Sequence, residues 1–510
     1  MRFVSVAQMQ AADRAAQQRP QTDGLALMLR AGTELARHVA AIARLKGTRR
    51  VLLLAGKGNN GGDAFVAAKA LRLAGFLSEI WMVTYPDTLK GDALEAFSWM
   101  KNADIPYSVL PRPDDWNSPE QRTGAISLDA ILVDALLGTG CKGVPHGTVA
   151  SAIRWINTQR DHSFILAADI PSGINGDTGT GDGEFVRADL TVTFARPKTG
   201  FSNPANASVF GEVTVADIGM PDEIADAATT TGFGGIGGFI AAPEILRKIP
   251  PRLWHANKGT FGKLCIRGGS ERYPHAPILA ALGATRSGVG LLSLSVPETS
   301  RVAASIHVPE AIVYRELSDF SAFDAVVYGP GLGPPVPGNR FQLKAKRAVV
   351  DADGLNLLAQ TPGFRFDDGS AILTPHPGEA ARLLGCAVSE IQDNRTEAVR
   401  ELADRYNAVA VLKGAGTLVC RPKREPWLNL TGNSGMATGG TGDVLAGLVG
   451  GLFAQGMDAF DAACLAVWAH GHAGNLVAWQ DGPRAVTPLS LASALSLTKR
   501  GLYNYKRQAI

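Results

Sequence analysis

The stretch VLLLAGKGNNGGDAFVAAKALRLAG, residues 51–75, decides the fold class of this chain. Its first six residues, 51–56, form an uninterrupted apolar run, as in a strand that is buried on both faces. Residues 63–75 carry the pattern of a helix, and a glycine-rich turn joins the two. A strand, a tight turn and a helix in this order predict one βα unit of a parallel sheet.

The same alternation continues through both halves of the chain. Continuous apolar strands between helices indicate an α/β fold, with parallel sheets covered on both faces. Further strands are predicted at 79–84, 130–136, 164–169 and 190–195. In the second half, a strand followed by a turn is predicted within each of the segments 263–269, 324–333, 347–356, 371–379 and 409–419, and C-terminal helices are predicted at 443–455, 459–479 and 487–497.

A change of composition separates the two halves. The stretch DAATTTGFGGIGGF, residues 226–239, is rich in threonine and glycine and suits a linker or an interdomain loop. We therefore expect an N-terminal domain at 1–225, a glycine-rich linker at 226–240 and a C-terminal domain at 241–510.

Composition narrows the class of function. The 50 lysines and arginines nearly balance the 47 aspartates and glutamates, so nothing favours nucleic acid or a membrane surface as a partner. Five scattered cysteines without a CxxC pair argue against a disulfide framework and a zinc site. The first residues have no apolar signal core, and no run is long enough to span a membrane. We expect a cytoplasmic enzyme.

The turn GKGNNGGD, residues 56–63, lies where ligands bind in open parallel sheets, beyond the carboxyl end of a strand. It fits G-x-G-x-x-G, the dinucleotide-binding pattern, but a dinucleotide-binding dehydrogenase would also have an acidic residue near the end of the next strand. Glu79 starts that strand and Asp87 lies past its end, so this interpretation is disfavoured. Instead, Asn59, Asn60 and Asp63 offer oxygens and amides to a polar ligand or a cation.

Two later strand ends repeat this design, in VDALLGTGCKG (133–143) and AADIPSGINGDTG (167–179). Asn60, Asp134 and Ser172 thus stand at three strand ends as hard oxygen ligands. Such oxygens suit an alkali or alkaline-earth cation better than zinc.

Asp169 and Lys142, in the same two segments, are candidates for an acid/base pair. For any one of these aspartates, the alternative is an ordinary turn or cap residue.

In the second half, the stretch NLTGNSGMATGGTGDVLAG (429–447) is dense in glycine and ends in a helix-forming run. Glycines and the first turn of a helix together form an anion site, most often for phosphate. Asp443 beside a phosphate makes sense if it takes a proton from a hydroxyl that attacks the phosphate. The alternative is a glycine-rich loop with Asp443 as an ordinary N-cap.

These motifs carry a family resemblance. GKGNNGGD, DALLGTG and DIPSGINGDTG resemble the NAD(P)H-hydrate epimerase family. YPHAP, GPGLG, DADGLN, TPHPGE, VLKGAGTLV and TGNSGMATGGTGDVLAGLVGGLFAQG resemble the NAD(P)H-hydrate dehydratase family, which is ribokinase-like. One chain carrying both resembles the bifunctional NAD(P)H-hydrate repair enzymes of bacteria, with a Rossmann-like three-layer first domain.

The resemblance implies repair of hydrated nicotinamide cofactors, NADHX and NADPHX. The first domain would interconvert the R and S epimers at C6, and the second would dehydrate the S epimer while ADP becomes AMP and phosphate. The implied cofactors are K⁺ in the first site and Mg²⁺ in the second. We expect small-molecule partners only, in a homo-oligomer.

The resemblance also implies site residues. In the first domain, Asp169 and Lys142 would move protons, and Asn60, Asp134 and Ser172 would hold K⁺. The hydrate would contact Asn59, Asn60, Gly61, Gly62, Asp63, Gly138, Thr139, Gly140, Cys141, Lys142, Gly143, Val144 and Asp169.

In the second domain, Asp443 would be the catalytic base. The hydrated ring would contact Ala276, Gly331, Gly333, His376 and Asp443, and the nucleotide would bind Lys413, Gly414, Ala415, Gly416, Thr417 and Gly442.

A different enzyme remains the alternative: a ribokinase-like small-molecule kinase whose first domain only binds. Such a kinase would release a stable phosphate ester, whereas a dehydratase releases free phosphate.

Overall fold

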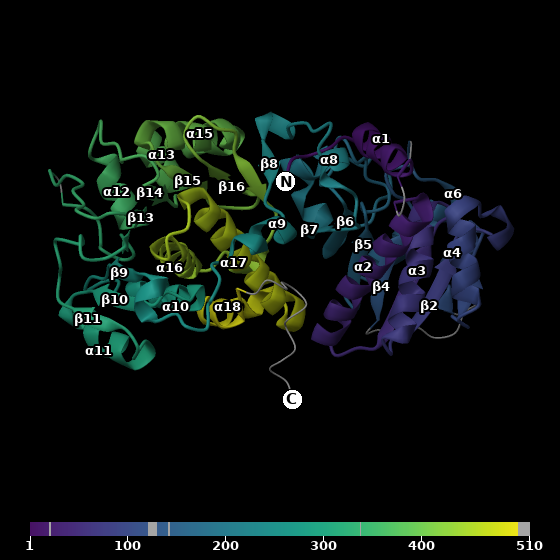
Figure 1. Ribbon diagram of the computed structural model, residues 1–510, viewed down its shortest axis with the longest axis horizontal. Helices are drawn as coiled ribbons and strands as arrows, with labels where there is room; N and C mark the ends of the chain where they lie inside the picture. The colour runs from purple at the N-terminus through teal and green to yellow at the C-terminus, as the bar shows by residue number, and fades with distance from the viewer. Residues whose placement is uncertain (20–21, 121–129, 141–142, 337, 498–510) are drawn as a thin grey trace. The chain divides into compact units, whose positions relative to one another are not determined.

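The computed structural model describes residues 1–19, 22–120, 130–140, 143–336 and 338–497 (Figure 1). The chain divides into two compact units, each with one sheet. Among the described residues, unit 1 comprises Met1–Phe233 and Ala241–Pro243, and unit 2 comprises Gly234–Ile240 and residues 244–497. The α/β class predicted from the apolar runs is confirmed in both units.

The sheet of unit 1 has seven strands in the order β3-β2-β1-β4-β5-β6-β7, and all neighbours are parallel. The order reverses between β1 and β4, and such a switch point opens a crevice at the carboxyl ends of the two strands. The strands are β1 Arg50–Ala55, β2 Leu77–Met82, β3 Tyr107–Val109, β4 Ile131–Ala135, β5 Phe164–Ala168, β6 Leu190–Phe194 and β7 Glu212–Ala216.

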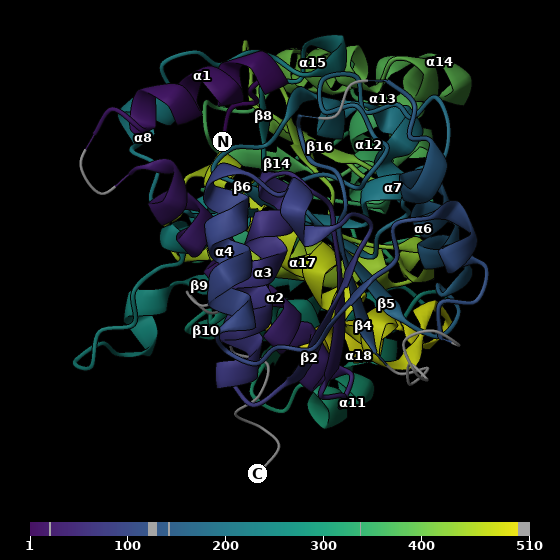
Figure 2. The same ribbon diagram turned by 90° about the vertical axis from the view of Figure 1, so that its right-hand side faces the viewer.

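Helices cover both faces of this sheet (Figure 2). On one face, α3 packs on β1 and β2 and lies between α2 and α4. On the other, α6 and η2 enclose a buried cluster in which Trp81, Trp116 and Trp155 touch one another. The helices are α1 Val6–Ala16, α2 Gly24–Leu45, α3 Asn59–Leu73, η1 Pro86–Thr88, α4 Gly91–Lys101, η2 Pro113–Trp116, α6 Gly147–Thr158, η3 Thr199–Ser202, η4 Pro204–Asn206, α7 Ala207–Phe210 and α8 Asp222–Ala225.

Helix α3 begins at Asn59, four residues before the predicted start at 63. The glycine-rich turn is therefore largely the first turn of the helix, and it packs against neighbouring backbone. A Cβ on Gly56 would lie 1.9 Å from the Leu136 carbonyl oxygen, and one on Gly61 would lie 2.1 Å from the Gly56 carbonyl oxygen. Only glycine permits this close approach, which brings the start of α3 against the end of β4.

The sheet of unit 2 has ten strands in the order β11-β10-β9-β12-β13-β14-β15-β16-β17-β8. Pairing is parallel from β11 to β15, whereas β16 is antiparallel to both β15 and β17. The strands are β8 Gly238–Phe239, β9 Lys263–Arg267, β10 Leu291–Ser295, β11 Ile312–Tyr314, β12 Ala325–Tyr328, β13 Ala348–Val350, β14 Ala371–Leu373, β15 Val409–Leu412, β16 Thr417–Cys420 and β17 Trp427–Asn429.

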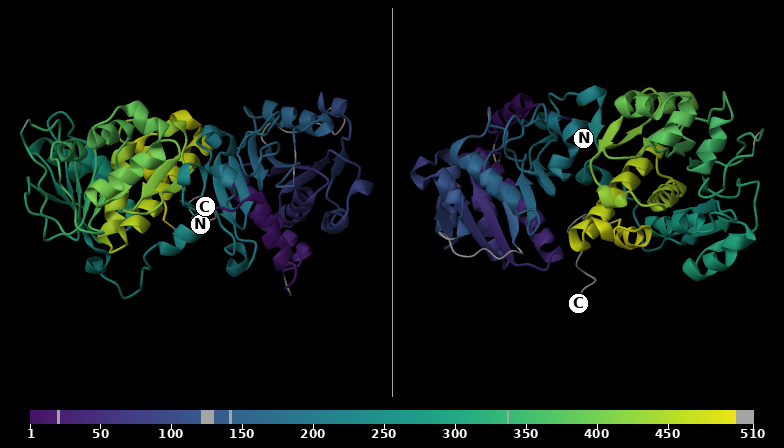
Figure 3. Two further views of the ribbon diagram at one scale, coloured as in Figure 1. Left: turned by 90° about the horizontal axis from the view of Figure 1, so that it is seen from above. Right: turned by 180° about the vertical axis from the view of Figure 1, so that it is seen from behind.

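Two helices of unit 2 approach each other closely enough to need glycine. A Cβ on Gly283 of α10 would lie 2.0 Å from the Val444 carbonyl oxygen, and one on Gly447 of α16 would lie 1.7 Å from the Ala280 carbonyl oxygen. The long α17, yellow in Figure 3, packs on α16 and on β14 to β17. The helices are η5 Phe233–Gly235, α9 Ala242–Ile245, η6 Leu246–Lys248, η7 Lys258–Phe261, α10 Ala276–Ser287, α11 Glu298–His307, α12 Asp353–Ala359, α13 Pro377–Leu384, α14 Val388–Asp393, α15 Arg395–Tyr406, η8 Ser434–Met436, α16 Thr441–Ala454, α17 Ala459–Asp481, η9 Pro483–Ala485 and α18 Pro488–Ala494.

The segment predicted as a linker joins unit 1 at one end and unit 2 at the other through strand pairing. Thr230 forms a β-bridge with Phe3 in unit 1, and β8 pairs with β17 in unit 2. Phe239 of β8 is buried and pairs with Leu428 of β17, so the end of the segment belongs to the sheet of unit 2. Within the described ranges, no helix is both long and apolar enough to cross a membrane.

Candidate active sites

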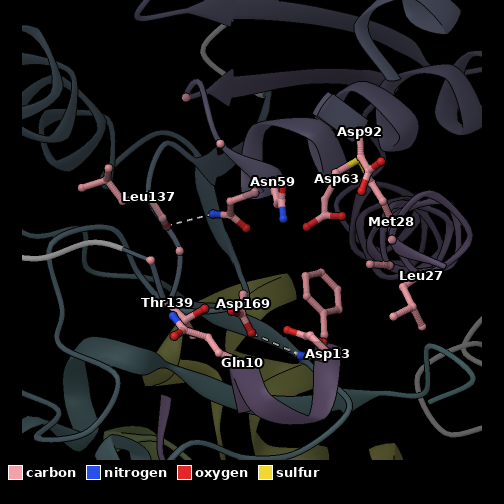
Figure 4. A pocket seen from close by; sticks show the side chains of 18 of the residues that line it. Gln10, Asp13, Leu27, Met28, Asn59, Asp63, Asp92, Leu137, Thr139 and Asp169 are labelled. Carbon is pink, nitrogen blue, oxygen red and sulfur yellow. Dashed lines mark hydrogen bonds between the residues drawn. The ribbon is translucent and has the colours of Figure 1, made fainter. Parts of the chain in front are cut away.

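A cavity of about 630 Å³ opens in unit 1 at the crevice between β1 and β4 (Figure 4). Turns after the strands form its floor, and α1 and α2 form its wall. From the strand ends it is lined by Gly56, Lys57, Gly58, Asn59, Asn60, Asp63, Val83, Thr84, Leu136, Leu137, Gly138, Thr139, Gly140, Asp169, Phe194 and Lys198, and from α1 and α2 by Met9, Gln10, Asp13, Gly24, Leu27, Met28 and Ala31.

A buried ion pair stands at the base of this cavity. The Lys198 Nζ atom lies 2.5 Å from Asp169 Oδ1, and Thr193 Oγ1 donates to the same carboxylate oxygen at 3.1 Å. Asp169 follows β5 with a φ of 63°, a strained conformation for a residue other than glycine. Within the described ranges, Asp169 Oδ2 has no hydrogen-bond partner, so one carboxylate oxygen remains available to a ligand.

The ammonium group of Lys198 is fully engaged. Besides Asp169, it donates to Thr193 Oγ1 at 2.9 Å and to the Phe194 carbonyl oxygen at 3.1 Å. An ammonium group has three protons, and three acceptors surround this one. Lys198 therefore holds Asp169 in place, and its side chain is only 2% exposed.

Three further carboxyl groups line the cavity from different helices: Asp13 from α1, Asp63 from α3 and Asp92 from α4 (Figure 4). Burial raises the pKa of Asp63 well above its usual range, and the charges of Asp169 and Asp13 raise it further. Burial also raises the pKa of Asp13, although the charge of Lys198 opposes this. Four carboxyl groups and two ammonium groups thus line one cavity, and burial shifts Asp13 and Asp63 toward their protonated forms.

The start of α1 is tied to the segment that carries Lys198. The Val4 amide donates to the Pro197 carbonyl oxygen, and the Thr199 amide donates to the Val4 carbonyl oxygen, both at 3.0 Å. A capping box between Ser5 and Gln8 then starts the helix. These bonds place Asp13, two turns along the helix, over the cavity.

The three residues predicted to bind a cation do come together. Asp134, which is fully buried, accepts from Ser172 through both oxygens: the hydroxyl at 2.6 Å and the backbone amide at 2.7 Å. Asn60 Nδ2 donates to the Leu137 carbonyl oxygen at 2.8 Å, and Ser172 Oγ lies 3.3 Å from the same oxygen. The ends of β1, β4 and β5 thus meet around one carbonyl group.

One atom of this cluster has no partner. Asn60 Oδ1 is buried and accepts no hydrogen bond from the part of the chain that the structure describes. Leaving a buried acceptor unsatisfied is costly, so such an atom calls for an explanation. Burial raises the pKa of Asp134 to about 6, while its hydrogen bonds to Ser172 lower it. Carboxylate, amide, hydroxyl and carbonyl oxygens form a donor set that fits a hard cation.

The predicted hydrate-binding residues divide into three groups. Asn59, Asn60, Asp63, Asp169, Gly138, Thr139 and Gly140 line the cavity. Gly61 and Gly62 are buried against Gly56 and Met28, Gly143 does not line the cavity, and Val144 is exposed beside Gly183. Cys141 and Lys142 lie outside the described residues, so the pairing of Lys142 with Asp169 stays a prediction.

In unit 2, a second cluster of charges forms at the carboxyl ends of the central strands. Lys413, which follows β15, places its Nζ atom 2.8 Å from Asp351 Oδ1 and 3.9 Å from Glu379 Oε2. Burial lowers the pKa of Lys413, but the charges of Asp351 and Glu379 outweigh it and raise the pKa overall. A Cβ on Gly442 would lie 3.4 Å from the same Nζ atom, so the start of α16 faces this lysine.

Asp443 lies in the first turn of α16 and is not its N-cap. The cap is Gly440, with a φ of 96°, so the alternative of an ordinary capping role for Asp443 is wrong. Burial raises the pKa of Asp443 to about 7, the charge of Asp351 adds to this, and that of Lys413 opposes it. A carboxyl group with this pKa exchanges its proton near neutral pH, which suits a general base.

The start of α16 is fixed from below by His470 of α17. Its Nε2 atom lies 2.8 Å from the Thr441 carbonyl oxygen, which can only accept, so that ring nitrogen carries the proton. Burial lowers the pKa of His470 to about 4, which keeps the ring neutral at physiological pH.

The predicted nucleotide loop, 413–417, turns sharply between β15 and β16. Gly414 and Gly416 have φ values of 129° and 63°, which favour glycine, and Ala415 lies between them. Arg395 Nη2 lies 3.2 Å from the Leu412 carbonyl oxygen and 3.3 Å from that of Lys413, and it also contacts the Gly416 carbonyl oxygen. Thr417 Oγ1 closes the turn by donating to the Gly414 carbonyl oxygen at 2.8 Å.

The predicted ring-binding residues lie around the same strand ends. A Cβ on Gly331 would touch Ala276, and the Gly333 amide donates to Asp353 at 2.8 Å. His376 caps α13, and burial lowers its pKa. Its Nδ1 atom accepts from the backbone amides of Gly378 and Glu379.

Sequence reasoning missed several residues of these clusters: Asp13, Lys198, Asp351, Glu379 and Arg395. Asp351 and Glu379 stand in the stretches DADGLN and TPHPGE directly after strands, and Lys198 follows β6 in the same way. Ligands of open parallel sheets bind beyond the carboxyl ends of the strands, so Asp351, Glu379 and Lys198 could have been predicted as site residues. Asp13 carries no such signal, because α1 precedes the first strand.

Two family models match this chain, one within each of its two compact units. Residues 24–200 match the family model described as YjeF-related protein N-terminus, and residues 264–497 match the model described as NAD(P)H-hydrate dehydratase. The chain is 35% identical to the bifunctional NAD(P)H-hydrate repair enzyme Nnr of Moorella thermoacetica, over 98% of this chain and 97% of the relative. It is also 35% identical to the protein of the same name from Escherichia coli, over 92% of this chain and 88% of the relative.

Among solved structures, the ADP/ATP-dependent NAD(P)H-hydrate dehydratase of Bacillus subtilis, co-crystallised with ATP and Mg²⁺, is 30% identical to this chain. The match covers 51% of this chain and 96% of that one, with a TM-score of 0.46. The resemblance inferred from the sequence motifs is confirmed by the relatives that match along nearly the whole length.

Proposed function

This chain belongs to the family of bifunctional NAD(P)H-hydrate repair enzymes, and from that premise we propose how its two units divide the reaction. Unit 1 interconverts the R and S epimers of NADHX and NADPHX at C6. Unit 2 removes water from the S epimer and restores NADH or NADPH. The R epimer is thereby recovered through the S epimer, so one chain repairs both forms.

In unit 1, Asp169 acts as the base. Its Oδ1 atom is held by Lys198 and Thr193, which leaves the second carboxylate oxygen for the C6 hydroxyl of the substrate. The substrate lies in the cavity between Asn59, Asp63 and Thr139. The pairing with Lys198 supplies the positive partner for which the sequence suggested Lys142.

Asn60, Asp134 and Ser172 would hold a K⁺ ion beside this site, and both Asn60 and Ser172 contact the Leu137 carbonyl oxygen. The support is the unsatisfied Asn60 Oδ1 atom within an all-oxygen donor set. When bound, the ion supplies positive charge that fixes the turns after β1 and β4. The hydrogen bonds among Asp134, Ser172 and Leu137 orient Asn60 and the turn at Gly138 toward the substrate.

In unit 2, Asp443 takes the proton from the C6 hydroxyl of the S epimer, and the freed oxygen attacks the terminal phosphorus of ADP. The phosphoryl group moves to the C6 oxygen, and AMP leaves. The ring nitrogen then supplies the electron pair that expels phosphate from C6, and loss of a proton from C5 restores the reduced nicotinamide. The amides at the start of α16 face the phosphoryl group.

The nucleotide lies along residues 413–417 and the start of α16, where Lys413 faces Gly442. The Lys413 ammonium group neutralises phosphate charge while Asp351 and Glu379 hold it in place. Mg²⁺ would be held here mostly through phosphate oxygens and water, with the carboxylates of Asp351 and Asp443 as hard oxygens of the same site. When bound, it supplies positive charge to the phosphates.

The single observation that carries the proposal for unit 2 is the placement of the Asp443 carboxyl group, with a pKa raised to about 7, at the start of α16, which faces the partly buried Lys413. The test uses purified protein, Mg²⁺, K⁺ and a mixture of R and S NADHX, with ADP, with ATP, or with neither.

Full return of reduced-nicotinamide absorbance with ADP, together with AMP and free phosphate, is the expected outcome. Recovery that stops at the S fraction would remove the epimerase assignment. A stable phosphate ester in place of free phosphate would overturn the dehydratase assignment in favour of a kinase.

A further inference from the structure

Two carboxyl groups that line the epimerase cavity have no role in the proposed mechanism yet, Asp13 on α1 and Asp92 on α4. Asp92 lies against Gly24, whereas the charges of Lys198 and Asp169 act on Asp13. Asp13 lines the cavity beside Asp169 and across from Asn59 (Figure 4). Within the described part of the chain, this carboxyl group makes no hydrogen bond and no ion pair. It is a partly buried polar group directed at the substrate.

Epimerisation at C6 needs an acid as well as a base. A bond to C6 must break and re-form on the other face, and the group that leaves C6 must be protonated. Lys198 is unsuited to this, because Asp169, Thr193 and the Phe194 carbonyl group already accept its three protons. The acid must be another group of the same cavity.

Asp13 is better placed than Asp63 for this task. The pKa of Asp13 is affected by the charges of both members of the ion pair, Lys198 and Asp169. The pKa of Asp63 is affected by the carboxylates of Asp169 and Asp13 and not by Lys198. The C6 hydroxyl and the ring nitrogen N1 are attached to the same carbon, so the acid must lie close to the base. Asp63 also lies in α3, where the family resemblance assigns it to holding the substrate.

We propose that Asp13 is a second catalytic residue of unit 1, which protonates N1 of the hydrated ring while Asp169 deprotonates the C6 hydroxyl. This inference rests on the proposed epimerase function. As Asp169 takes the hydroxyl proton, the C6–N1 bond breaks, C6 becomes an aldehyde, and the electron pair goes to N1. N1 takes its proton from Asp13.

Rotation about the C5–C6 bond then presents the other face of the aldehyde. N1 attacks C6 and returns its proton to Asp13, while the oxygen takes its proton back from Asp169. No atom or electron is gained or lost, and no co-reactant is needed. The only change is the configuration at C6.

The raised pKa of Asp13 fits this role, since burial favours its protonated form. The charged or titratable groups that face it are Lys198 and Asp169 at the strand ends, Asp63 on α3 and Arg14 on its own helix. At high pH the Asp13 carboxyl group loses its proton and can no longer act as the proton donor. We therefore expect the epimerase to have an alkaline limb in its pH profile that depends on Asp13.

The test measures R-to-S conversion of NADHX by Asp13→Asn, a substitution of equal size, with Gln18→Ala, at an exposed and uncharged position just after α1, as the matched control. Asp13→Asn is expected to lower kcat by about 10²–10⁴-fold with KM within about threefold, and to remove the alkaline limb. Gln18→Ala is expected to retain both. Dehydration of pure S epimer by the same protein reports whether the chain is folded.

Asp13→Glu keeps the acid and is expected to restore the alkaline limb at reduced kcat. Conversion by Asp13→Asn within threefold of the unsubstituted protein would overturn the proposal. So would a loss of the alkaline limb in Asp63→Asn with the limb retained in Asp13→Asn. If the unsubstituted protein itself fails to convert the R epimer, the epimerase function fails, which is a separate outcome.

Discussion

Lys198 and Asp169 form an ion pair of 2.5 Å within the cavity of unit 1, with the lysine side chain 2% exposed. The two residues are 29 positions apart and follow adjacent parallel strands, β5 and β6. A buried charge of this kind is stable only with a partner, so each residue fixes the other. The pair thus holds a carboxylate at the strand ends, where a substrate can reach its second oxygen.

Substituting each member of this ion pair in turn should distinguish its effect on epimer conversion from its effect on the free energy of unfolding. Asp169→Asn keeps the shape of the side chain and should lower R-to-S conversion by at least about 10²-fold. Lys198→Met should lower it equally and also destabilise unit 1 by about 3–5 kcal/mol, because it leaves a buried carboxylate without its partner. Epimer conversion and denaturant unfolding measure the two effects.

Asp182→Asn, at an exposed aspartate of the same loop region, is the matched control and should change neither quantity. If Asp169→Asn retains conversion, Asp169 is not the base. If Lys198→Met is as stable as the unsubstituted protein, the ion pair has no structural role.

A monovalent cation should bind where Asn60 Oδ1 lacks a partner. Added K⁺ should raise the Tm of unit 1 and accelerate epimer conversion, because a ligand that binds only the folded state stabilises it. Asn60→Leu, of similar size, should abolish both responses, whereas Asn102→Ala at an exposed helix end should retain them. Differential scanning calorimetry across a K⁺ series at constant ionic strength measures the shift, and an unchanged K⁺ response in Asn60→Leu would place the ion elsewhere.

The pKa of Asp443 sets a pH dependence for dehydration. The base must be deprotonated, so kcat/KM for the S epimer should rise about tenfold per pH unit below about 7 and level off above it. Asp443→Asn should reduce dehydration to background with epimer conversion intact. Asp481→Asn, at the exposed end of α17, is the control and should keep the full profile.

The same raised pKa has a consequence for stability. Between pH values of about 4 and 7 the folded state binds the Asp443 proton that the unfolded state has released, so the free energy of unfolding falls as pH rises through that window. Above pH 7 the folded protein holds a disfavoured carboxylate. Asp443→Asn should therefore unfold at a higher temperature than the unsubstituted protein at pH 8, by about 2–4 °C. A lower Tm would show that the carboxylate is stabilising.

Two glycines of α16 should respond in opposite ways to alanine. At Gly442 a Cβ meets only Lys413 Nζ at 3.4 Å, and alanine favours a helix over glycine by about 0.5–1 kcal/mol. Gly442→Ala should therefore fold at least as stably but raise KM for the nucleotide about tenfold, because its methyl group enters the phosphate site.

Gly447→Ala is the matched comparison in the same helix. Its Cβ would lie 1.7 Å from the Ala280 carbonyl oxygen, so it should separate α10 from α16 and lower the Tm. Thermal unfolding and nucleotide titration of the two variants give the comparison. Equal stability of both variants would contradict the close packing of these helices.

The sequence was most informative where local pattern alone determines structure. Apolar runs such as 51–56 predicted the strands, because a strand buried on both faces has no polar position. Errors occurred at boundaries: α3 starts at Asn59 instead of 63, since glycines and asparagines look like a loop although the helix has begun. The predicted linker likewise ends in β8, because strand pairing with β17 is a long-range contact.

For the sites, the sequence by itself determined which residue types stand at the strand ends, including Asn60, Asp134, Ser172 and Asp443, since each follows a recognisable strand. It could not determine which charges meet, because pairing depends on how strands order in the sheet. Only the tertiary structure placed Lys198 against Asp169, and only it placed Asp13 over the same cavity from a helix that precedes the first strand. The shifted pKa values of Asp63 and Asp443 have the same origin, because burial and neighbouring charge exist only once the chain has folded.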